Sequence, residues 1–222
     1  MTLRGKFPKL YPILDAGFLP AEGREELLAR LVRDLVAAGV GILQYRNKDG
    51  GEAEVLADAR AMRSAAGDQM LLVMNDWPRL AVEAGFDGVH VGQTDKSPTE
   101  ARAILGPERI VGVSTHSEAQ VRTADEAPVD YVAIGPVYAT ATKEAPDPVV
   151  GLEGVRMARS RTAKPLVAIG GIRIENAADV WAAGADSVAV ISALFGPGGD
   201  PAGRARAFLR CAGATKSQAK GM

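Results

Sequence analysis

Charged side chains follow three short apolar runs of this 222-residue chain. Arg46 and Lys48 end one run, Asp76 ends the next, and Asp95 follows a third. Two carboxylates would repel an anionic substrate that Arg46, Lys48 and the more distant Lys143 attract, unless a divalent metal ion compensates them. Mg²⁺ is typically held by one or two carboxylates together with phosphate oxygens and water. These residue types therefore predict a site in which Asp76 and Asp95 hold Mg²⁺ while the cations hold a diphosphate.

Eight apolar runs alternate with segments of helical periodicity, which is typical of βαβ units around a parallel sheet. The predicted strands are Lys9–Asp15, Gly41–Asn47, Met70–Asp76, Gly88–Gln93, Arg109–Thr115, Asp130–Tyr138, Pro165–Gly171 and Ser187–Phe195. Eight such units in about 200 residues match a single (β/α)8 TIM barrel. We expect this catalytic domain to span residues 1–211, with 212–222 as a disordered C-terminal tail.

A doubly wound open sheet is the competing architecture. Its first strand–helix turn would carry the G-x-G-x-x-G phosphate fingerprint, which the segment 15–20 lacks. The barrel is therefore the favoured fold, and barrel active sites lie at the C-terminal ends of the strands. The polar residues described above stand at those ends. Gly170-Gly171 and Ile191-Ser192 stand where such barrels usually bind a phosphate through backbone N–H groups, although a tight turn alone would also need the glycines.

Several of these residues have simpler interpretations. Asp76 precedes Trp77-Pro78 and could serve only as a helix N-cap, whereas Asp95 is not needed as a cap because Ser97 supplies one. We expect His90 to pack inside the barrel. His116 is expected to lead into a helix, with a general base as the alternative.

Composition and charge exclude several classes of protein. Lys and Arg number 26 against 27 Asp and Glu, so no overall positive field would hold nucleic acid or an anionic membrane. The lone Cys211 excludes an internal disulfide, and the N-terminus does not resemble a signal peptide, so we expect a cytoplasmic protein. We expect small-molecule substrates, and a homo-oligomer is compatible with the sequence.

Six motifs occur in order along nearly the whole chain. They are Leu43-Gln44-Tyr45-Arg46-Asn47-Lys48, Asn75-Asp76, Gly88-Val89-His90-Val91-Gly92-Gln93 with Asp95, Gly112-Val113-Ser114, Gly135-Pro136-Val137-Tyr138 with Thr140-Ala141-Thr142-Lys143, and Ala168-Ile169-Gly170-Gly171-Ile172. Together they resemble the thiamine phosphate synthase family. The resemblance implies a Mg²⁺-dependent transferase that joins hydroxymethylpyrimidine diphosphate to hydroxyethylthiazole phosphate, giving thiamine phosphate and pyrophosphate.

The resemblance also implies a role for each motif residue. It assigns the pyrimidine diphosphate to Gln44, Tyr45, Arg46, Asn47, Lys48, Asn75, Ser114 and Lys143, the metal to Asp76 and Asp95, and the thiazole phosphate to Thr140, Thr142, Gly171, Ile191 and Ser192. Lys143, Ser114 and Arg46 are expected to assist the chemical step. Departure of pyrophosphate would leave a pyrimidine carbocation that the thiazole nitrogen captures, so the protein contributes positioning and electrostatic stabilisation.

Two residues depart from the family pattern. Tyr45 stands where leucine is more frequent, and Asn47 stands where glutamate is common. Two alternative functions stay open: a thiazole tautomerase, which would need a proton-transfer group such as His116, and a non-catalytic barrel that binds a phosphate ligand. Retention of the metal and diphosphate residues favours the synthase.

Overall fold

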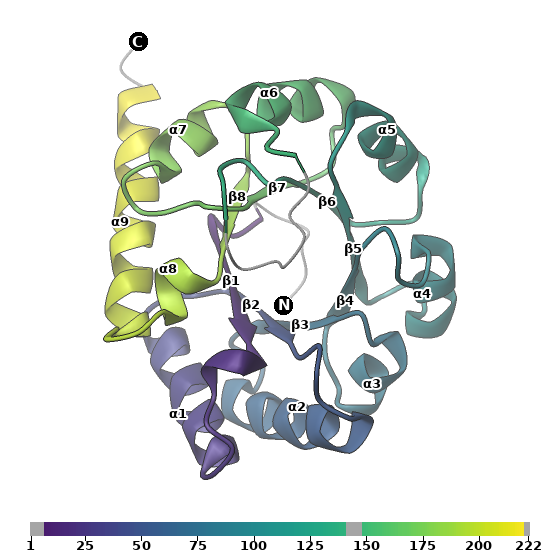
Figure 1. The fold of residues 1–222 in the computed structure, drawn as a ribbon, viewed down its shortest axis with the longest axis vertical. Helices are drawn as coiled ribbons and strands as arrows, with labels where there is room; N and C mark the ends of the chain where they lie inside the picture. The colour runs from purple at the N-terminus through teal and green to yellow at the C-terminus, as the bar shows by residue number, and fades with distance from the viewer. Residues whose placement is uncertain (1–6, 141–147, 220–222) are drawn as a thin grey trace.

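Eight parallel strands close into a barrel in which each strand pairs with the next and β8 pairs with β1 (Figure 1). The computed structural model describes residues 7–140 and 148–219, with side chains described up to residue 214. The strands are β1 (Leu10–Asp15), β2 (Ile42–Arg46), β3 (Leu71–Asn75), β4 (Gly88–Val91), β5 (Ile110–Thr115), β6 (Tyr131–Ile134), β7 (Leu166–Ile169) and β8 (Ser187–Val190).

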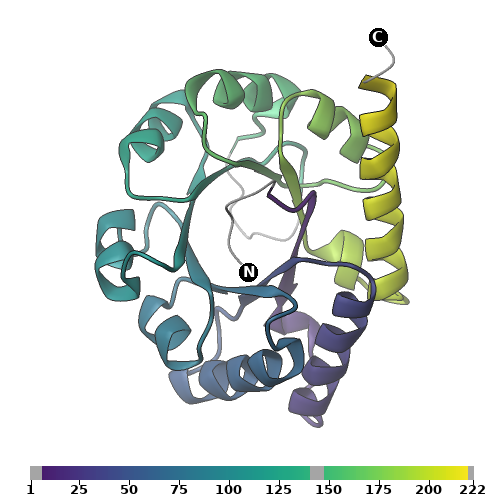
Figure 2. The same cartoon turned by 180° about the vertical axis from the view of Figure 1, so that it is seen from behind.

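Helices surround this barrel on the outside, as both views along its axis show (Figures 1 and 2). They are the short 3-10 helix η1 (Ala16–Phe18), α1 (Arg24–Ala37), α2 (Glu52–Ala66), α3 (Pro78–Glu83), α4 (Pro98–Leu105), α5 (Glu118–Glu126), α6 (Gly151–Arg161), α7 (Ala177–Ala182), α8 (Ser192–Phe195) and α9 (Pro201–Ala219). The predicted (β/α)8 TIM barrel is confirmed. Ser97 caps α4 as expected, in a reciprocal capping box with Glu100.

Every observed strand lies inside the run that predicted it, but two predicted strands extend too far, and β6 ends at Ile134 rather than at Tyr138. The last run was expected to remain extended to Phe195, whereas β8 ends at Val190 and Ser192–Phe195 forms α8. Short apolar runs do not distinguish a strand from a buried helical turn. The expected tail after residue 211 is helical as far as Ala219, because α9 continues through a segment rich in alanine, a strong helix former.

Two layers of apolar side chains pack on opposite sides of the strands. The outer layer fills the space between the strands and the helices, and it includes Leu43 and Tyr45 of β2. The inner layer fills the barrel and includes Tyr11, Ile13, Ile42 and Tyr131 together with Phe7, Leu71, Val73, Ile110, Ala133, Val167 and Ala189. Since successive residues of a strand point to opposite faces, alternate residues within each strand face the inside of the barrel.

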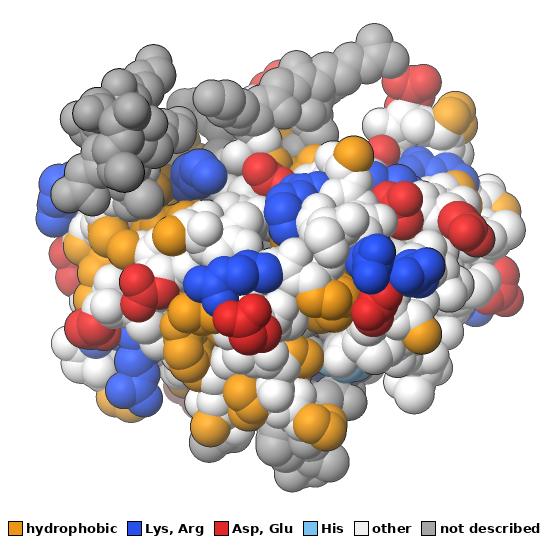
Figure 3. Space-filling model, turned by 90° about the horizontal axis from the view of Figure 1, so that it is seen from above, with side chains coloured by type: hydrophobic (Ala, Val, Ile, Leu, Met, Phe, Trp, Pro, Cys, Tyr) orange, Lys and Arg blue, Asp and Glu red, His pale blue; other side chains and the backbone are white. Residues whose placement is uncertain are grey.

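The outer surface carries charges of both signs. On the side of the molecule in Figure 3, Lys and Arg side chains are interspersed with Asp and Glu. Among the described residues, the helices include none that is long and apolar enough to cross a membrane.

Candidate active site

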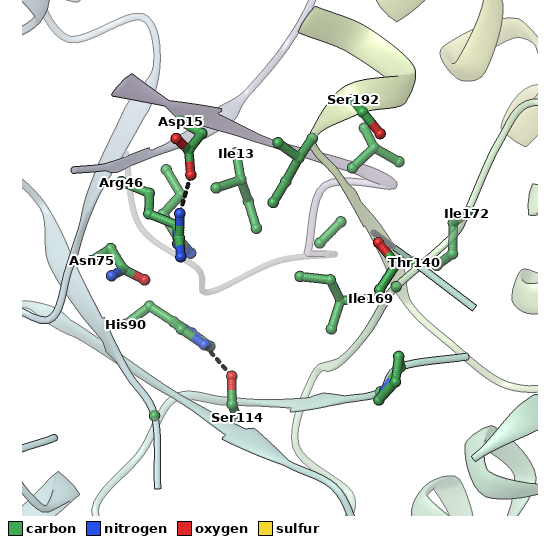
Figure 4. A pocket seen from close by; sticks show the side chains of 18 of the residues that line it. Ile13, Asp15, Arg46, Asn75, His90, Ser114, Thr140, Ile169, Ile172 and Ser192 are labelled. Carbon is green, nitrogen blue, oxygen red and sulfur yellow. Dashed lines mark hydrogen bonds and ion pairs between the residues drawn. The ribbon is translucent and has the colours of Figure 1, made fainter. Parts of the chain in front are cut away.

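A cavity of about 920 Å³ opens at the C-terminal ends of the strands. This volume is within the range of small-molecule sites. Eleven residues assigned to the site from the sequence line it: Gln44, Arg46, Lys48, Asn75, Asp76, Asp95, Ser114, Thr140, Gly171, Ile191 and Ser192. Figure 4 shows labelled side chains from several strands gathered around this space. The fold therefore brings together residues that are up to 148 positions apart, from Gln44 to Ser192 (192 − 44).

Arg46 is held at the cavity wall by an ion pair with Asp15, which ends β1 (Figure 4). The second oxygen of Asp15 accepts the backbone N–H of Gly17 at 2.9 Å. Both carboxylate oxygens are therefore engaged, and they fix the direction of the guanidinium. Sequence reasoning missed Asp15, although it stands at a predicted strand end like the residues that were identified.

Asp76 and Asp95 form a carboxylate pair on the same rim. Lys48 is ion-paired with Asp76, and the backbone N–H of Gly92 donates to Asp95 at 2.8 Å. Burial, followed by the hydrogen bond shared with Asp95, raises the pKa of Asp76 to about 6. Burial also acts to raise the pKa of Asp95, but hydrogen bonds from Asp76 and Gly92 hold it below its ordinary value. The two carboxylates thus compete for a single proton.

The backbone of Asp76 is in the left-handed region, with φ of 64°. This conformation is uncommon for a residue with a side chain and is concentrated at functional sites. Asp76 does not cap the following helix, because the N-cap of α3 is Trp77 and no side chain caps that helix. The interpretation of Asp76 as a simple cap was therefore wrong.

The carboxylate pair fits a divalent cation. Mg²⁺ prefers oxygen ligands, and its positive charge would compensate both carboxylates at once. Among the described residues, no three His, Cys, Asp or Glu side chains gather closely enough to hold a metal by themselves. A Mg²⁺ ion held by Asp76 and Asp95 would therefore take its other ligands from substrate oxygens and water, as this ion usually does.

Asn75 supplies an amide group beside this pair. Its residue is 8% exposed, and its Nδ2 is buried without a hydrogen-bond partner. An unpaired buried donor costs about 1–3 kcal/mol, so water or a ligand is expected to complete this bond. Asn75 lines the cavity, where an acceptor oxygen of a ligand would satisfy it (Figure 4).

The opposite side of the cavity is built mainly from backbone and uncharged side chains. Gly170 and Gly171 have φ of 100° and 63°. A Cβ at Gly171 would lie 2.6 Å from the Ala139 carbonyl oxygen, so the turn requires glycine there. Asn176 holds the same turn by donating to the Gly171 carbonyl at 3.3 Å. Arg173, which sequence reasoning missed, is exposed and also lines this side.

Tyr45 and Asn47, which the resemblance assigns to the diphosphate, lie away from the cavity. Tyr45 is fully buried in the outer layer, where its hydroxyl donates to Asp58, and Asn47 Nδ2 donates to Glu54 at 2.9 Å. Neither lines the cavity. Both alternate with Gln44, Arg46 and Lys48, so the strand pleat turns them toward α2. Thr142 and Lys143 lie outside the described residues.

Both histidines line the cavity. His90 is 8% exposed, and burial lowers its pKa to about 4, so the ring is neutral at neutral pH. It packs inside the barrel as expected, and it also contacts Ser114, which was not expected. His116 lies just before α5, with Nδ1 at 2.6 Å from the Gly135 carbonyl oxygen. Its position agrees with the expectation that it leads into a helix.

Known proteins resemble the chain along most of its length. The family model described as thiamine monophosphate synthase matches residues 10–194. A thiamine-phosphate synthase of Koribacter versatilis is 51% identical over 205 residues, covering 92% of this chain and 96% of the relative. One from Albidiferax ferrireducens is 43% identical and covers 84% of each chain. The solved thiamine phosphate pyrophosphorylase of Pyrococcus furiosus has a TM-score of 0.83 and 29% identity, covering 96% of this chain and 99% of that structure. The chain belongs to the thiamine monophosphate synthase family.

Proposed function

We propose that the chain couples hydroxymethylpyrimidine diphosphate with hydroxyethylthiazole phosphate, giving thiamine phosphate and pyrophosphate in a Mg²⁺-dependent reaction. The family and its named relatives make this protein a transferase of the thiamine phosphate synthase type. The observation that carries the proposal is the carboxylate pair of Asp76 and Asp95 on the same cavity wall as Arg46 and Lys48. A site for a neutral ligand would not need this combination of charges.

The diphosphate is proposed to lie against the charged wall. Arg46 and Lys48 would contact its phosphoryl oxygens, and Asn75 Nδ2 would donate to one of them. Asp76 and Asp95 would hold Mg²⁺, which would supply positive charge to stabilise the leaving group. Ser114 lines the same wall and would donate to a diphosphate oxygen, and Gln44 would bind another polar group of this substrate.

The thiazole phosphate is proposed to bind across the cavity. Gly171, Ile191 and Ser192 line the side of the cavity where barrels of this fold usually bind a phosphate, and their backbone N–H groups are proposed to hold it. Thr140 lines the same side, and Thr142 is assigned there from the sequence alone. The exposed guanidinium of Arg173 adds a positive charge near this phosphate.

The proposed reaction breaks the bond between the pyrimidine methylene carbon and the diphosphate oxygen, and the electron pair leaves with pyrophosphate. The thiazole nitrogen then donates its lone pair to the methylene carbon. No side chain has to act as a nucleophile. Arg46 and Ser114, with Lys143 assigned from sequence alone, would stabilise charge on the leaving group. The apolar floor of the cavity, at Ile13 and Ile169, would keep water from the cationic carbon (Figure 4).

The two other functions considered from the sequence are not favoured by the comparisons. The relatives cited above are named as synthases or pyrophosphorylases rather than tautomerases or sensors. The substrates proposed are small molecules. A cytoplasmic location is proposed on the ground of the single cysteine.

Release of pyrophosphate tests this proposal. We expect net release only when the pyrimidine diphosphate, the thiazole phosphate and Mg²⁺ are all present, because without the thiazole nitrogen the cationic carbon would recombine with pyrophosphate. Release from the diphosphate alone at the same rate would indicate a hydrolase and would contradict the proposal. Binding of either phosphate compound without any release would indicate a ligand-binding barrel.

A further inference from the structure

A chain of neutral hydrogen bonds crosses the barrel interior below the cavity. Gln44 Nε2 donates to the Tyr11 hydroxyl at 3.1 Å, and the Tyr11 and Tyr131 hydroxyls are 2.9 Å apart. The Tyr131 hydroxyl is 2.8 Å from His90 Nδ1, and His90 Nε2 is 2.8 Å from Ser114 Oγ (Figure 4). We call these five residues the interior chain. Its two ends line the cavity, whereas both tyrosines lie below it, 1% or less exposed.

The donor at one end sets the direction of every proton in the interior chain. Gln44 Nε2 can only donate, so the Tyr11 oxygen accepts from it. The Tyr11 hydroxyl then donates its hydrogen bond to the Tyr131 oxygen, and the Tyr131 hydroxyl donates to His90 Nδ1. His90 must therefore carry its proton on Nε2 and donate it to Ser114 Oγ.

With the Gln44 amide nitrogen facing Tyr11, the reverse direction would leave a buried proton without an acceptor. If His90 donated from Nδ1 to Tyr131, and Tyr131 donated to Tyr11, the Tyr11 hydroxyl would have no acceptor among its hydrogen-bonded partners. A buried unsatisfied donor costs about 1–3 kcal/mol. The forward direction satisfies each member and leaves one proton, that of the Ser114 hydroxyl, directed toward the cavity.

Burial keeps the interior chain neutral and rigid. Burial raises the pKa of both tyrosine hydroxyls and lowers the pKa of His90 to about 4, so no member ionises near neutral pH. The Tyr131 ring stacks on His90 with centroids 5.5 Å apart and is in edge contact with Tyr11. Gly112 makes room for it, because a Cβ there would lie 2.0 Å from Tyr131 Cζ. The hydroxyl of Tyr131 is therefore fixed in place by packing.

We propose that Tyr131 is a positioning residue for the coupling reaction: by donating to His90 Nδ1 it fixes the Nε2-protonated tautomer, so that Ser114 offers its own O–H to an oxygen of the diphosphate. This inference rests on the assignment of Ser114 to the diphosphate made under the proposed function. With the other tautomer, Ser114 would donate to His90 and would present only lone pairs to an anionic group. The interior chain thus decides whether Ser114 attracts or repels the leaving group.

The test compares Tyr131→Phe with Tyr11→Phe. Each variant removes one buried hydroxyl from the same aromatic cluster, so the packing cost is matched. Only Tyr131 donates to His90, and Tyr131 still has His90 as an acceptor when Tyr11 is changed. The chain has only two histidines, so ¹⁵N imidazole shifts of labelled protein report the tautomer directly, with His116→Gln used for assignment.

We expect wild type and Tyr11→Phe to show a single Nε2-protonated tautomer at His90, and Tyr131→Phe to show a mixture. We expect kcat of Tyr131→Phe to fall at least about tenfold, more than that of Tyr11→Phe, with KM for the thiazole phosphate unchanged. An Nδ1-protonated His90 in the wild-type protein would overturn the proposal, even if Tyr131→Phe failed to fold, and would leave the proposed function intact. Full activity of Ser114→Ala would instead overturn the assignment of Ser114 to the diphosphate.

Discussion

The two sides of the cavity are lined by different kinds of chemical group. The charged half, from β1 to β4, consists of Asp15, Arg46, Lys48, Asp76 and Asp95, and its charges are paired with one another. The neutral half, from β6 to β8, consists of the Gly170-Gly171 turn, Thr140, Ile191 and Ser192. Only the exposed Arg173 adds a charged side chain to the part of the neutral half that the structure describes.

This difference matches the change that each substrate undergoes. Pyrophosphate gains charge as its bond to carbon breaks, and mobile or coordinated charges stabilise such a leaving group. The phosphate of the acceptor takes no part in bond breaking, so fixed backbone donors suffice to hold it. The charged half is therefore expected to control the rate of the chemical step, and the neutral half is expected to control binding of the acceptor.

Acid pH is expected to have the largest effect, which is a loss of stability against unfolding. It acts through His90 of the interior chain, next to the charged half. The pKa of His90 is about 4 in the folded protein and about 6.5 when unfolded, so the unfolded chain takes up a proton first as the pH falls. The contribution of neutral His90 to the free energy of unfolding is therefore fully present above about pH 6.5 and is lost between about pH 6.5 and 4. It amounts to roughly 3 kcal/mol.

The measurement is urea unfolding from pH 7 to pH 4.5 for wild type and for His90→Gln. Asp76 acts in the opposite direction, because its raised pKa lets the folded protein bind a proton first. The difference between the two proteins removes this contribution. Parallel stability curves for wild type and variant would show that His90 is not held neutral by burial.

Replacing one member of the carboxylate pair should slow the reaction. We expect Asp95→Asn to lower Mg²⁺-dependent turnover at least about tenfold, which is roughly 1.4 kcal/mol in the barrier. The fold should remain intact, because Asp95 caps no helix and Ser97 caps α4. Steady-state turnover as a function of Mg²⁺ concentration provides the test. Asp34→Asn, an exposed carboxylate on α1, is the control. Unchanged turnover and metal dependence in Asp95→Asn would refute the metal assignment.

A substitution in the neutral half should instead raise KM for the thiazole phosphate. Gly171→Ala would place a Cβ 2.6 Å from the Ala139 carbonyl oxygen in a backbone conformation with φ of 63°. The left-handed conformation alone costs about 1–2 kcal/mol, so the turn should shift. We expect KM for the thiazole phosphate to rise about fivefold while KM for the diphosphate stays unchanged. Gly106→Ala is the matched control, because its φ is 77° and nothing lies within 4 Å of its added Cβ. A rise in the diphosphate KM alone would reverse the assignment of the two halves.

The charged half was largely predictable from the sequence, because long polar side chains at the ends of apolar runs are conspicuous. Arg46, Lys48, Asp76 and Asp95 were all identified in this way, whereas Asp15 was overlooked at the end of the first run. The direction of each side chain was harder to predict. Tyr45 and Asn47 follow the same motif but point to the outer layer, since a strand alternates its faces and the sequence alone does not say which face is inside.

The neutral half was less accessible to sequence reasoning, because its main groups are backbone amides that every residue carries. The glycine pair at 170–171 indicated a turn but not its contacts, and α8 was mistaken for the end of a strand. The interior chain could not be predicted at all. Tyr11 and Tyr131 are 120 positions apart. The sequence around each one predicts only an ordinary aromatic residue of the core. Only the closed barrel brings their hydroxyls together.

Mass identification of the product tests the central claim most directly. The wild-type protein and His116→Asn are incubated with the pyrimidine diphosphate, the thiazole phosphate and Mg²⁺, with and without excess EDTA. We predict thiamine phosphate and pyrophosphate from both proteins, and neither product when EDTA is present, because Asp76 and Asp95 are proposed to hold a metal ion that stabilises the leaving group. A reaction that EDTA leaves unchanged and that His116→Asn abolishes would contradict the account and would indicate proton-transfer chemistry of the tautomerase type.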